Sequence, residues 1–130
     1  VVNDSAAPAN YKTDLYNLGD LPADAVVITL VHIYMTVKKS ADSGTIYFQL
    51  KGKTNGSEFT PGTNTATASW ALYSYQYSTN PVTGNGWTAA EVNALQAGVR
   101  LYSSGTVYAM CTQIYVEVTY STFTPKVWIM

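Results

Sequence analysis

The fold is decided by a segment near the middle of the chain, Asn80-Pro81-Val82-Thr83-Gly84-Asn85-Gly86-Trp87-Thr88-Ala89-Ala90-Glu91-Val92-Asn93-Ala94-Leu95-Gln96-Ala97-Gly98. Its first part favours turns, because Asn-Pro and Thr-Gly pairs are typical of tight turns. Thr88 can then cap a helix while Glu91, three residues later, reaches back to the Thr88 amide, which is the spacing of a capping box. Gly98 stands where a left-handed C-terminal cap belongs. The segment therefore predicts one short helix near residues 89–96.

A helix of this length does not persist alone, so packing must hold it in place. Trp87 directly precedes the cap, and Leu95 lies on the narrow apolar edge of the helix. We expect these two side chains to anchor the segment in the core. The fold motif predicted here consists of Trp87, Thr88, Glu91, Leu95 and Gly98.

The rest of the chain predicts strands, because apolar and polar residues alternate along it. Between Ala25 and Lys38 the apolar side chains of one face are Val31, Ile33, Met35 and Val37. The first half of this stretch, residues 26–30, is apolar on both faces, which predicts cover on both sides by another element or another subunit. Further strands are expected over residues 11–18, 45–51, 58–60, 65–78, 99–102 and 106–120.

Strands at this spacing, without alternating helices, predict an all-β fold, an antiparallel β-sandwich of jelly-roll-like or immunoglobulin-like type. The Cys…Trp…Cys spacing of a true immunoglobulin domain does not occur, because Cys111 is the single cysteine. The 130 residues are expected to form one domain. We expect an extended N-terminal arm over residues 1–10, the sandwich over residues 11–120, and a C-terminal arm or closing strand over residues 121–130.

Both ends of the chain are expected to contact neighbouring subunits. An apolar run that follows Pro125 is unusual for a free monomer. It predicts either a final strand that closes the sandwich or an arm that pairs with the sheet edge of another subunit. The assembly contacts predicted in this way are Val1, Val2, Val127, Trp128, Ile129 and Met130.

Low charge is the main compositional feature. Charged residues make up 12% of the chain, about half of the usual share near 25%, while there are 11 tyrosines. This composition suits a surface covered by neighbouring subunits and equally an uncharged β domain. The net charge of -1 without a basic stripe disfavours nucleic acid as a partner. The longest apolar run is too short to span a bilayer, so no membrane partner is expected.

Few residues could support catalysis, and we expect no enzyme, no cofactor and no metal. His32 lies in the middle of a predicted strand, and Cys111 is expected to be a small buried hydrophobe. Glu91 is explained by the capping box, and Glu117 by an outward strand position. A calcium site is not specified by any spacing, although it stays open for the dispersed carboxylates of Asp14, Asp20, Asp24 and Asp42.

Aromatic side chains form the candidate ligand-binding surface. Tyr73, Tyr75 and Tyr77 alternate onto one face of a predicted strand, a possible sugar- or protein-binding row. Trp70 and Trp87 are further candidates for stacking on sugar rings. The alternative is that the tyrosine row packs inside the sandwich or against another subunit.

The chain resembles small β-rich proteins encoded by phages, prophages and environmental viruses. The resemblance rests on Asn80 to Gly84, Trp87-Thr88 and Glu91 to Val99, followed by Gln113 to Tyr120. An early segment with Asp14-Leu15-Tyr16 and Leu21-Pro22 fits the same pattern, so the resemblance covers roughly residues 15–120. It implies a non-enzymatic structural role in a virus particle.

In that role the chain would decorate or cement a capsid, or form part of a fibre or spike. The resemblance implies homo-oligomers or other virion proteins as partners, and a virion or extracellular location. Two alternatives stay open. One is a carbohydrate-binding or adhesin module, with glycan as the partner. The other is the subunit of an extracellular filament joined by strand exchange.

Overall fold

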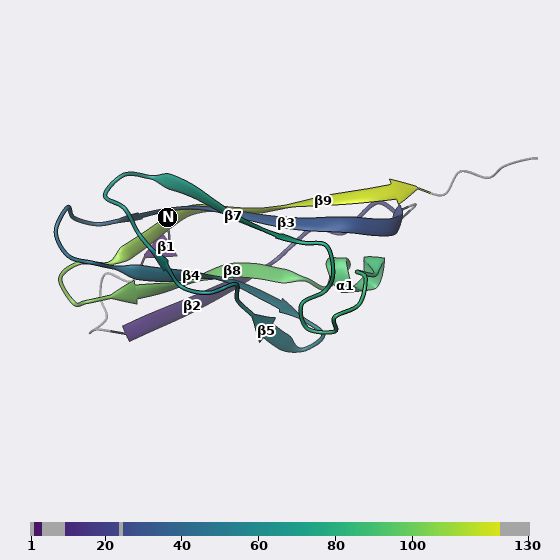
Figure 1. The fold of residues 1–130 in the computed structure, drawn as a ribbon, viewed down its shortest axis with the longest axis horizontal. Coiled ribbons are helices and arrows are strands. Elements are labelled where there is room, and N and C mark those ends of the chain that lie inside the picture. Colours follow the sequence, from purple (N-terminus) through teal and green to yellow (C-terminus); the bar gives the residue numbers. More distant parts are fainter. Residues whose placement is uncertain (1, 4–9, 24, 123–130) are drawn as a thin grey trace, which may run out of the picture.

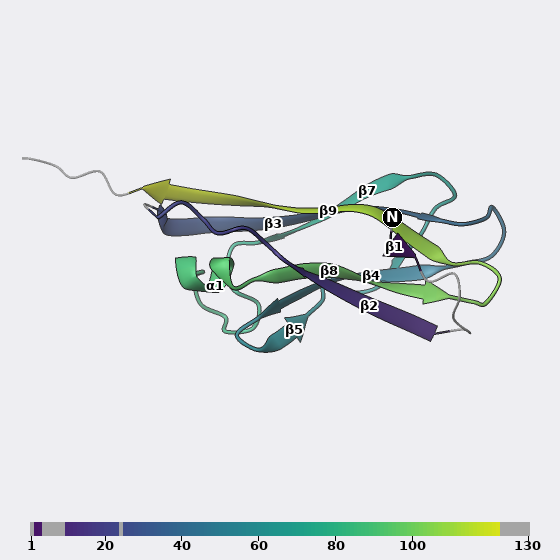
Figure 2. The same ribbon diagram turned by 180° about the vertical axis from the view of Figure 1, so that it is seen from behind.

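Two antiparallel β-sheets pack face to face in the computed structural model, which describes residues 2–3, 10–23 and 25–122 (Figures 1 and 2). The expected all-β sandwich is therefore confirmed. The first sheet, here called the long sheet, has the strand order β1 (Val2–Asn3), β9 (Ala109–Thr122), β3 (Ala25–Lys39) and β7 (Ala71–Tyr77). The second, called the short sheet, has the order β2 (Asn10–Asn17), β8 (Gln96–Ser103), β4 (Tyr47–Thr54) and β5 (Ser57–Phe59), with β6 (Asn64–Thr65) beside β4.

The core lies between the inner faces of the two sheets. The predicted alternation on β3 is confirmed, since Val31, Ile33, Met35 and Val37 are all fully buried. Opposite them the short sheet contributes inward side chains from β4 and β8, namely Phe48, Leu50, Val99 and Leu101. Alternation with a period of two is therefore the pattern that buries one face of each sheet.

The alternation expected along residues 106–120 is wrong in its first part. Regular alternation along this predicted strand would place Met110 on the same face as Ile114 and Val116, but the side chains buried in the core here are Ala109 and Cys111. The register explains the change, because Thr36 pairs with Gln113 and Val37 pairs with Cys111, which leaves Thr112 without a partner. One extra residue of this kind is a β-bulge, and it turns every later side chain to the other face.

The cover expected on both faces of residues 26–30 is not supplied by the described part of the chain. Ile28 is buried, but Val27 remains 51% exposed. The pairing of β3 with β9 shifts register between Ala25 and Val27 and again between Ile28 and Leu30. One face of this stretch thus packs in the core, and the other face is exposed to solvent or is covered by another molecule.

The helix motif is confirmed at its start and corrected at its end. Thr88 and Glu91 form the complete capping box of α1 (Ala89–Asn93), and Leu95 is buried. Trp87 is 5% exposed, and its indole N–H donates to the Tyr77 carbonyl at 3.0 Å. The helix ends at Asn93 rather than at residue 96, because β8 begins at Gln96.

Gly98 is not a helix cap. It lies inside β8, where it pairs with Leu15 of β2 and with Lys51 of β4. A Cβ atom at this position would collide with the Asp14 carbonyl oxygen. Glycine is therefore required here by the close approach of β2 to β8 and not by a left-handed turn.

We predict that Gly98→Ala destabilises the protein strongly, because β2 must move away from β8 to make room. The expected loss in the free energy of unfolding is at or above the upper end of about 1–3 kcal/mol for overpacking. Gly86→Ala is the matched control, since nothing lies within 4 Å of a Cβ placed there. Urea unfolding followed by circular dichroism measures both, and equal stability of the two variants would contradict the assignment.

Candidate functional site

The two lateral sides of the sandwich differ. On the side of β7, the row of Tyr73, Tyr75 and Tyr77 fills the space between the two sheets. The ring of Tyr73 meets Phe48 edge-on at a centroid distance of 4.7 Å, and Tyr77 meets Phe59 in the same way at 5.1 Å. The Tyr75 hydroxyl donates to Asn64 Oδ1 at 2.7 Å. Burial raises the pKa of the Tyr77 phenol to about 12. The row predicted as a binding face thus points at the short sheet, and its geometry supports the packing alternative.

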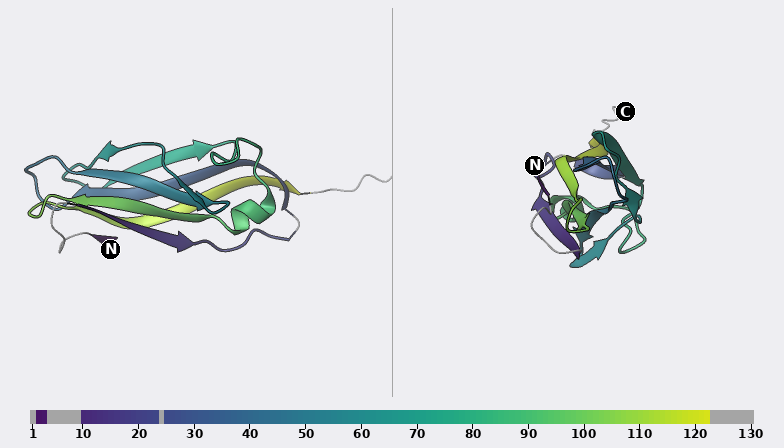
Figure 3. Two further views of the ribbon diagram at one scale, coloured as in Figure 1. Left: turned by 90° about the horizontal axis from the view of Figure 1, so that it is seen from below. Right: turned by 90° about the vertical axis from the view of Figure 1, so that its left-hand side faces the viewer.

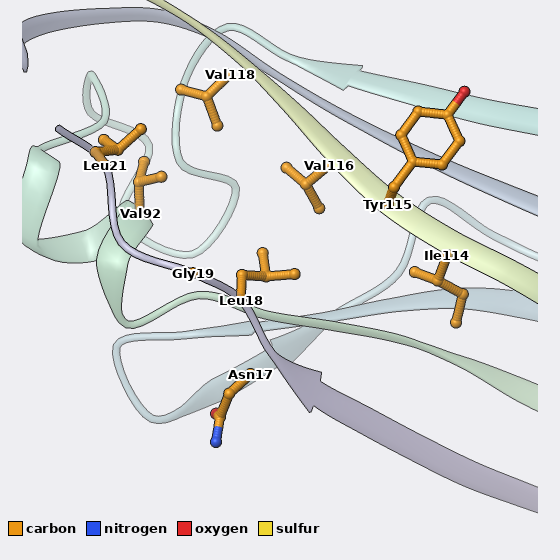
Figure 4. Close-up of a pocket in the computed structure, with 9 residues that line it drawn as sticks. All are labelled: Asn17, Leu18, Gly19, Leu21, Val92, Ile114, Tyr115, Val116 and Val118. Atoms are coloured by element: carbon orange, nitrogen blue, oxygen red, sulfur yellow. The ribbon is translucent and has the colours of Figure 1, made fainter.

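A groove opens on the other side, between β9 and the chain that follows β2. Its volume is about 440 Å³. Figure 4 shows Leu18, Val116 and Val118 pointing toward this space, while the ring of Tyr115 points away from it. The residues that line this lateral groove are Asn17, Leu18, Gly19, Leu21, Val92, Ile114, Tyr115, Val116 and Val118.

The groove exists because the two facing edge strands differ in length. β2 ends at Asn17, and the chain then crosses to β3, whereas β9 continues to Thr122 (Figure 3). The inner side chains of β9 beyond its bulge are therefore only partly buried, because the described part of the chain places no strand of the short sheet over them; they are Ile114, Val116 and Val118. The walls of the groove are largely apolar, and backbone forms one rim.

The rim is an unpaired strand edge. β9 pairs with β3 along its length, but on its other edge β1 pairs only with Met110 and Cys111. Within the described ranges, no strand pairs with that edge over residues 112–122. This stretch contains no Lys, Arg, Pro or Gly, and Glu117 is its single charged residue. Exposed edges are commonly protected by such residues, so the sequence leaves this edge available for pairing.

The capped helix closes one end of the groove. Val92 is buried and contributes to the groove wall. Asn93 Oδ1 accepts a hydrogen bond from the Leu21 amide at 2.7 Å, and Gln96 Nε2 donates to Asn17 Oδ1 at 2.7 Å. These two bonds tie the end of β2 and the chain after it to α1 and to the start of β8. The motif that fixes the helix therefore also positions the groove.

Asn80 holds the helix motif together, a role that its sequence context did not reveal. It is fully buried, and its Nδ2 donates to Asn55 Oδ1 at 3.0 Å and to Glu91 Oε2 at 3.1 Å. Its Oδ1 accepts from the Val82 amide at 2.9 Å. Hydrogen bonds, first among them that from the Thr88 amide, lower the pKa of the Glu91 carboxyl. Asn-Pro alone indicated only a turn, because two partners of the Asn80 side chain, Asn55 and Glu91, lie outside that turn in the sequence.

A second surface lies on the outer face of the long sheet. Tyr34 stacks on His32 at a centroid distance of 4.0 Å and on Tyr115 at 4.5 Å. Trp70 is 42% exposed, and the Lys38 ammonium lies 5.1 Å from the centroid of its ring. Of the aromatic residues predicted from the sequence, Trp70 is exposed on this outer aromatic face, whereas Trp87 is in the core.

Sequence reasoning missed Tyr34 and Tyr115 as members of this face. They come from strands far apart in sequence and meet because Tyr34 pairs with Tyr115 in the β3–β9 register. A hydrogen bond joins the Tyr34 hydroxyl and His32 Nδ1 at 2.8 Å. The His32 ring thus lies on an outer strand face, where its Nδ1 atom has a hydrogen-bond partner.

The other candidates considered from the sequence are Cys111 and the carboxylates of a calcium site. Cys111 is buried, its thiol donates to the Gln113 carbonyl at 3.5 Å, and burial raises the pKa of the thiol. Among the described residues there is no group of three or more His, Cys, Asp or Glu side chains that could hold a metal ion. Asp24, one of the four carboxylates considered for calcium, lies outside the described residues.

Most of the predicted assembly contacts also lie outside the described residues. These are Val1, Val127, Trp128, Ile129 and Met130. Val2 belongs to β1, which lies on the same edge of β9 as the groove. The strand β9 extends to Thr122, slightly past the expected boundary at residue 120.

No helix in the described part of the chain has the length and apolar character needed to cross a membrane. No protein-family model matches the chain, and comparisons with curated proteins and with solved structures give no significant match. The site is therefore interpreted from its geometry.

Proposed function

We propose that this chain is a non-enzymatic structural subunit that assembles by adding a strand to the open edge of β9. The observation that carries the proposal is the coincidence of an unpaired strand edge with an apolar groove beneath it. In β-strand addition, main-chain hydrogen bonds along an edge provide affinity, and pockets for alternate side chains provide specificity. The edge over residues 112–122 and the groove under Ile114, Val116 and Val118 offer both.

We further propose that the assembly is a virus particle, with the chain as a capsid decoration or cement protein or as a fibre or spike component. This part rests on the resemblance to virus-encoded β-rich proteins. The low share of charged residues, 12%, agrees with a surface largely covered by neighbours. Mass spectrometry of purified particles tests it, together with the presence of capsid and portal genes beside the coding gene. A filament subunit of cellular origin would instead be encoded beside secretion genes.

The proposal predicts that Val116→Lys blocks assembly. The substitution places an ammonium group in the groove, and burying an unpaired charge costs several kcal/mol. We expect association to weaken by at least about tenfold, which corresponds to about 1.4 kcal/mol. Size-exclusion chromatography with light scattering over a concentration series measures the change.

Ser74→Lys is the matched control, because it adds the same charge to the outer face of β7, at the opposite edge of the long sheet. It should assemble like the unmodified chain. Circular dichroism verifies that both variants are folded. If Val116→Lys does not fold, the milder variant Val116→Thr is used in its place. An unmodified chain that stays monomeric and attaches to particles regardless of these substitutions would contradict the proposal.

A second candidate function is glycan binding by the outer aromatic face. The supporting observation is that the exposed Trp70 ring and the stacked Tyr34 and Tyr115 rings lie on one side of the long sheet. Aromatic rings of this kind can stack on sugar rings, and the half-exposed Leu72 extends the same surface.

For this second function, Trp70→Ala and Tyr115→Ala should each abolish retention on a polysaccharide column or on a glycan array. Tyr75→Phe is the control, because Tyr75 is on the opposite, inner face and keeps its ring. Absence of any glycan bound by the unmodified chain would rule the function out.

A further inference from the structure

One segment of this chain has the apolar chemistry that suits the groove. Residues 126–130 are Lys126-Val127-Trp128-Ile129-Met130. We propose that these residues of a second copy pair antiparallel with residues 113–117 of β9 and fill the lateral groove. This inference rests on the proposed function and names the partner strand.

The register of this pairing follows from the chemistry of the two strands. When Val127 lies opposite Val116 and Ile129 lies opposite Ile114, both β-branched side chains of the added strand enter the groove. The alternating positions then lie on the outer face of the long sheet, because successive side chains of a strand point to opposite sides. Cross-strand pairs of apolar residues are the unit that stabilises such a sheet.

The same register pairs the outward side chains favourably. Lys126 is placed opposite Glu117, the single charged residue of the open edge. Trp128 is placed opposite Tyr115, whose ring already stacks on Tyr34 at 4.5 Å. Opposite charges and aromatic pairs directly across two strands are both stabilising. A parallel pairing over the same residues would keep Trp128 beside Tyr115 but would place Lys126 opposite Gln113 instead of Glu117. The charge pair therefore favours the antiparallel direction.

The edge already accepts a strand in this direction. β1 runs antiparallel to β9, with Val2 opposite Cys111 and Asn3 opposite Met110. An added strand over positions 113–117 lies beside β1 without overlapping it and runs in the same direction. The added strand therefore continues a pairing that the described structure contains.

Residues 126–130 of the same copy would not reach this position through a tight turn. A two-residue turn at Thr124-Pro125 directly after β9 would place Phe123 opposite Lys126. In such a hairpin the pairing then continues one residue at a time along both strands, so Met130 would lie opposite Thr119. Residues 126–130 would then leave Ile114 and Val116 uncovered, which is the reason for assigning the strand to a second copy.

Photo-crosslinking of the full chain tests the inference. Trp128→p-benzoylphenylalanine is introduced into the full chain, and equal amounts of chains with natural and ¹⁵N isotope content are mixed before irradiation. We expect crosslinked peptides from the region of residues 112–118, and we expect mixed-isotope pairs among them. Trp70→p-benzoylphenylalanine is the control, because Trp70 directly precedes β7, which β3 separates from the open edge of β9.

A charge exchange tests the register independently. Glu117→Lys and Lys126→Glu should each weaken association about two- to fivefold, and the double variant should restore most of it, as expected for a cross-strand charge pair. Crosslinks within one copy or to another surface, or failure of the double variant to recover, would overturn the inference. If the inference failed but Val116→Lys still blocked assembly, the proposed strand addition at β9 would stand with a different partner strand. A chain that is monomeric under all conditions would overturn both the inference and the proposed function.

Discussion

A mismatch in strand length between the two sheets is the constraint on which the rest of the structure depends. The long sheet is built on β3 and β9, of 15 and 14 residues, whereas β2, β4 and β8 have 8 residues each. An apolar sheet face must be buried against another element. The long sheet therefore overhangs the short one, and something other than a strand has to cover the excess (Figure 1).

The helix motif covers part of that overhang. Trp87, Val92 and Leu95 are buried in the core, and Asn80 connects the loop before them to Glu91 and to Asn55 at the end of β4. The part that α1 does not cover is the lateral groove. The same length mismatch thus explains why the chain needs a short helix and why one apolar side of β9 stays open.

Local chemistry made much of the fold predictable. The strand alternation of β3 and the capping box at Thr88 and Glu91 depend on neighbouring residues, and both are present as expected. Gly98 was misassigned because its requirement comes from Asp14, a residue far away in sequence. The bulge at Thr112 was missed for a similar reason, since an unpaired residue is visible only once the partner strand is known.

The candidate site was less predictable than the fold. A row such as Tyr73, Tyr75 and Tyr77 has the same alternation whether it faces a ligand or the opposite sheet. An open edge or a groove depends on which strands become neighbours, and the sequence does not contain that information locally. For the apolar segment after Pro125 the sequence predicted either a strand that closes the sandwich or an arm that pairs with the sheet edge of another subunit, and this segment lies outside the described residues.

Amide hydrogen exchange of β9 in dilute and in concentrated protein tests the central claim most directly. If a strand from another molecule pairs with the open edge, peptides that contain residues 112–118 should exchange more slowly in the assembled state. Peptides from β7, the opposite edge of the long sheet, should exchange at the same rate in both states. Assembly that leaves the exchange of residues 112–118 unchanged and slows that of β7 would contradict the account.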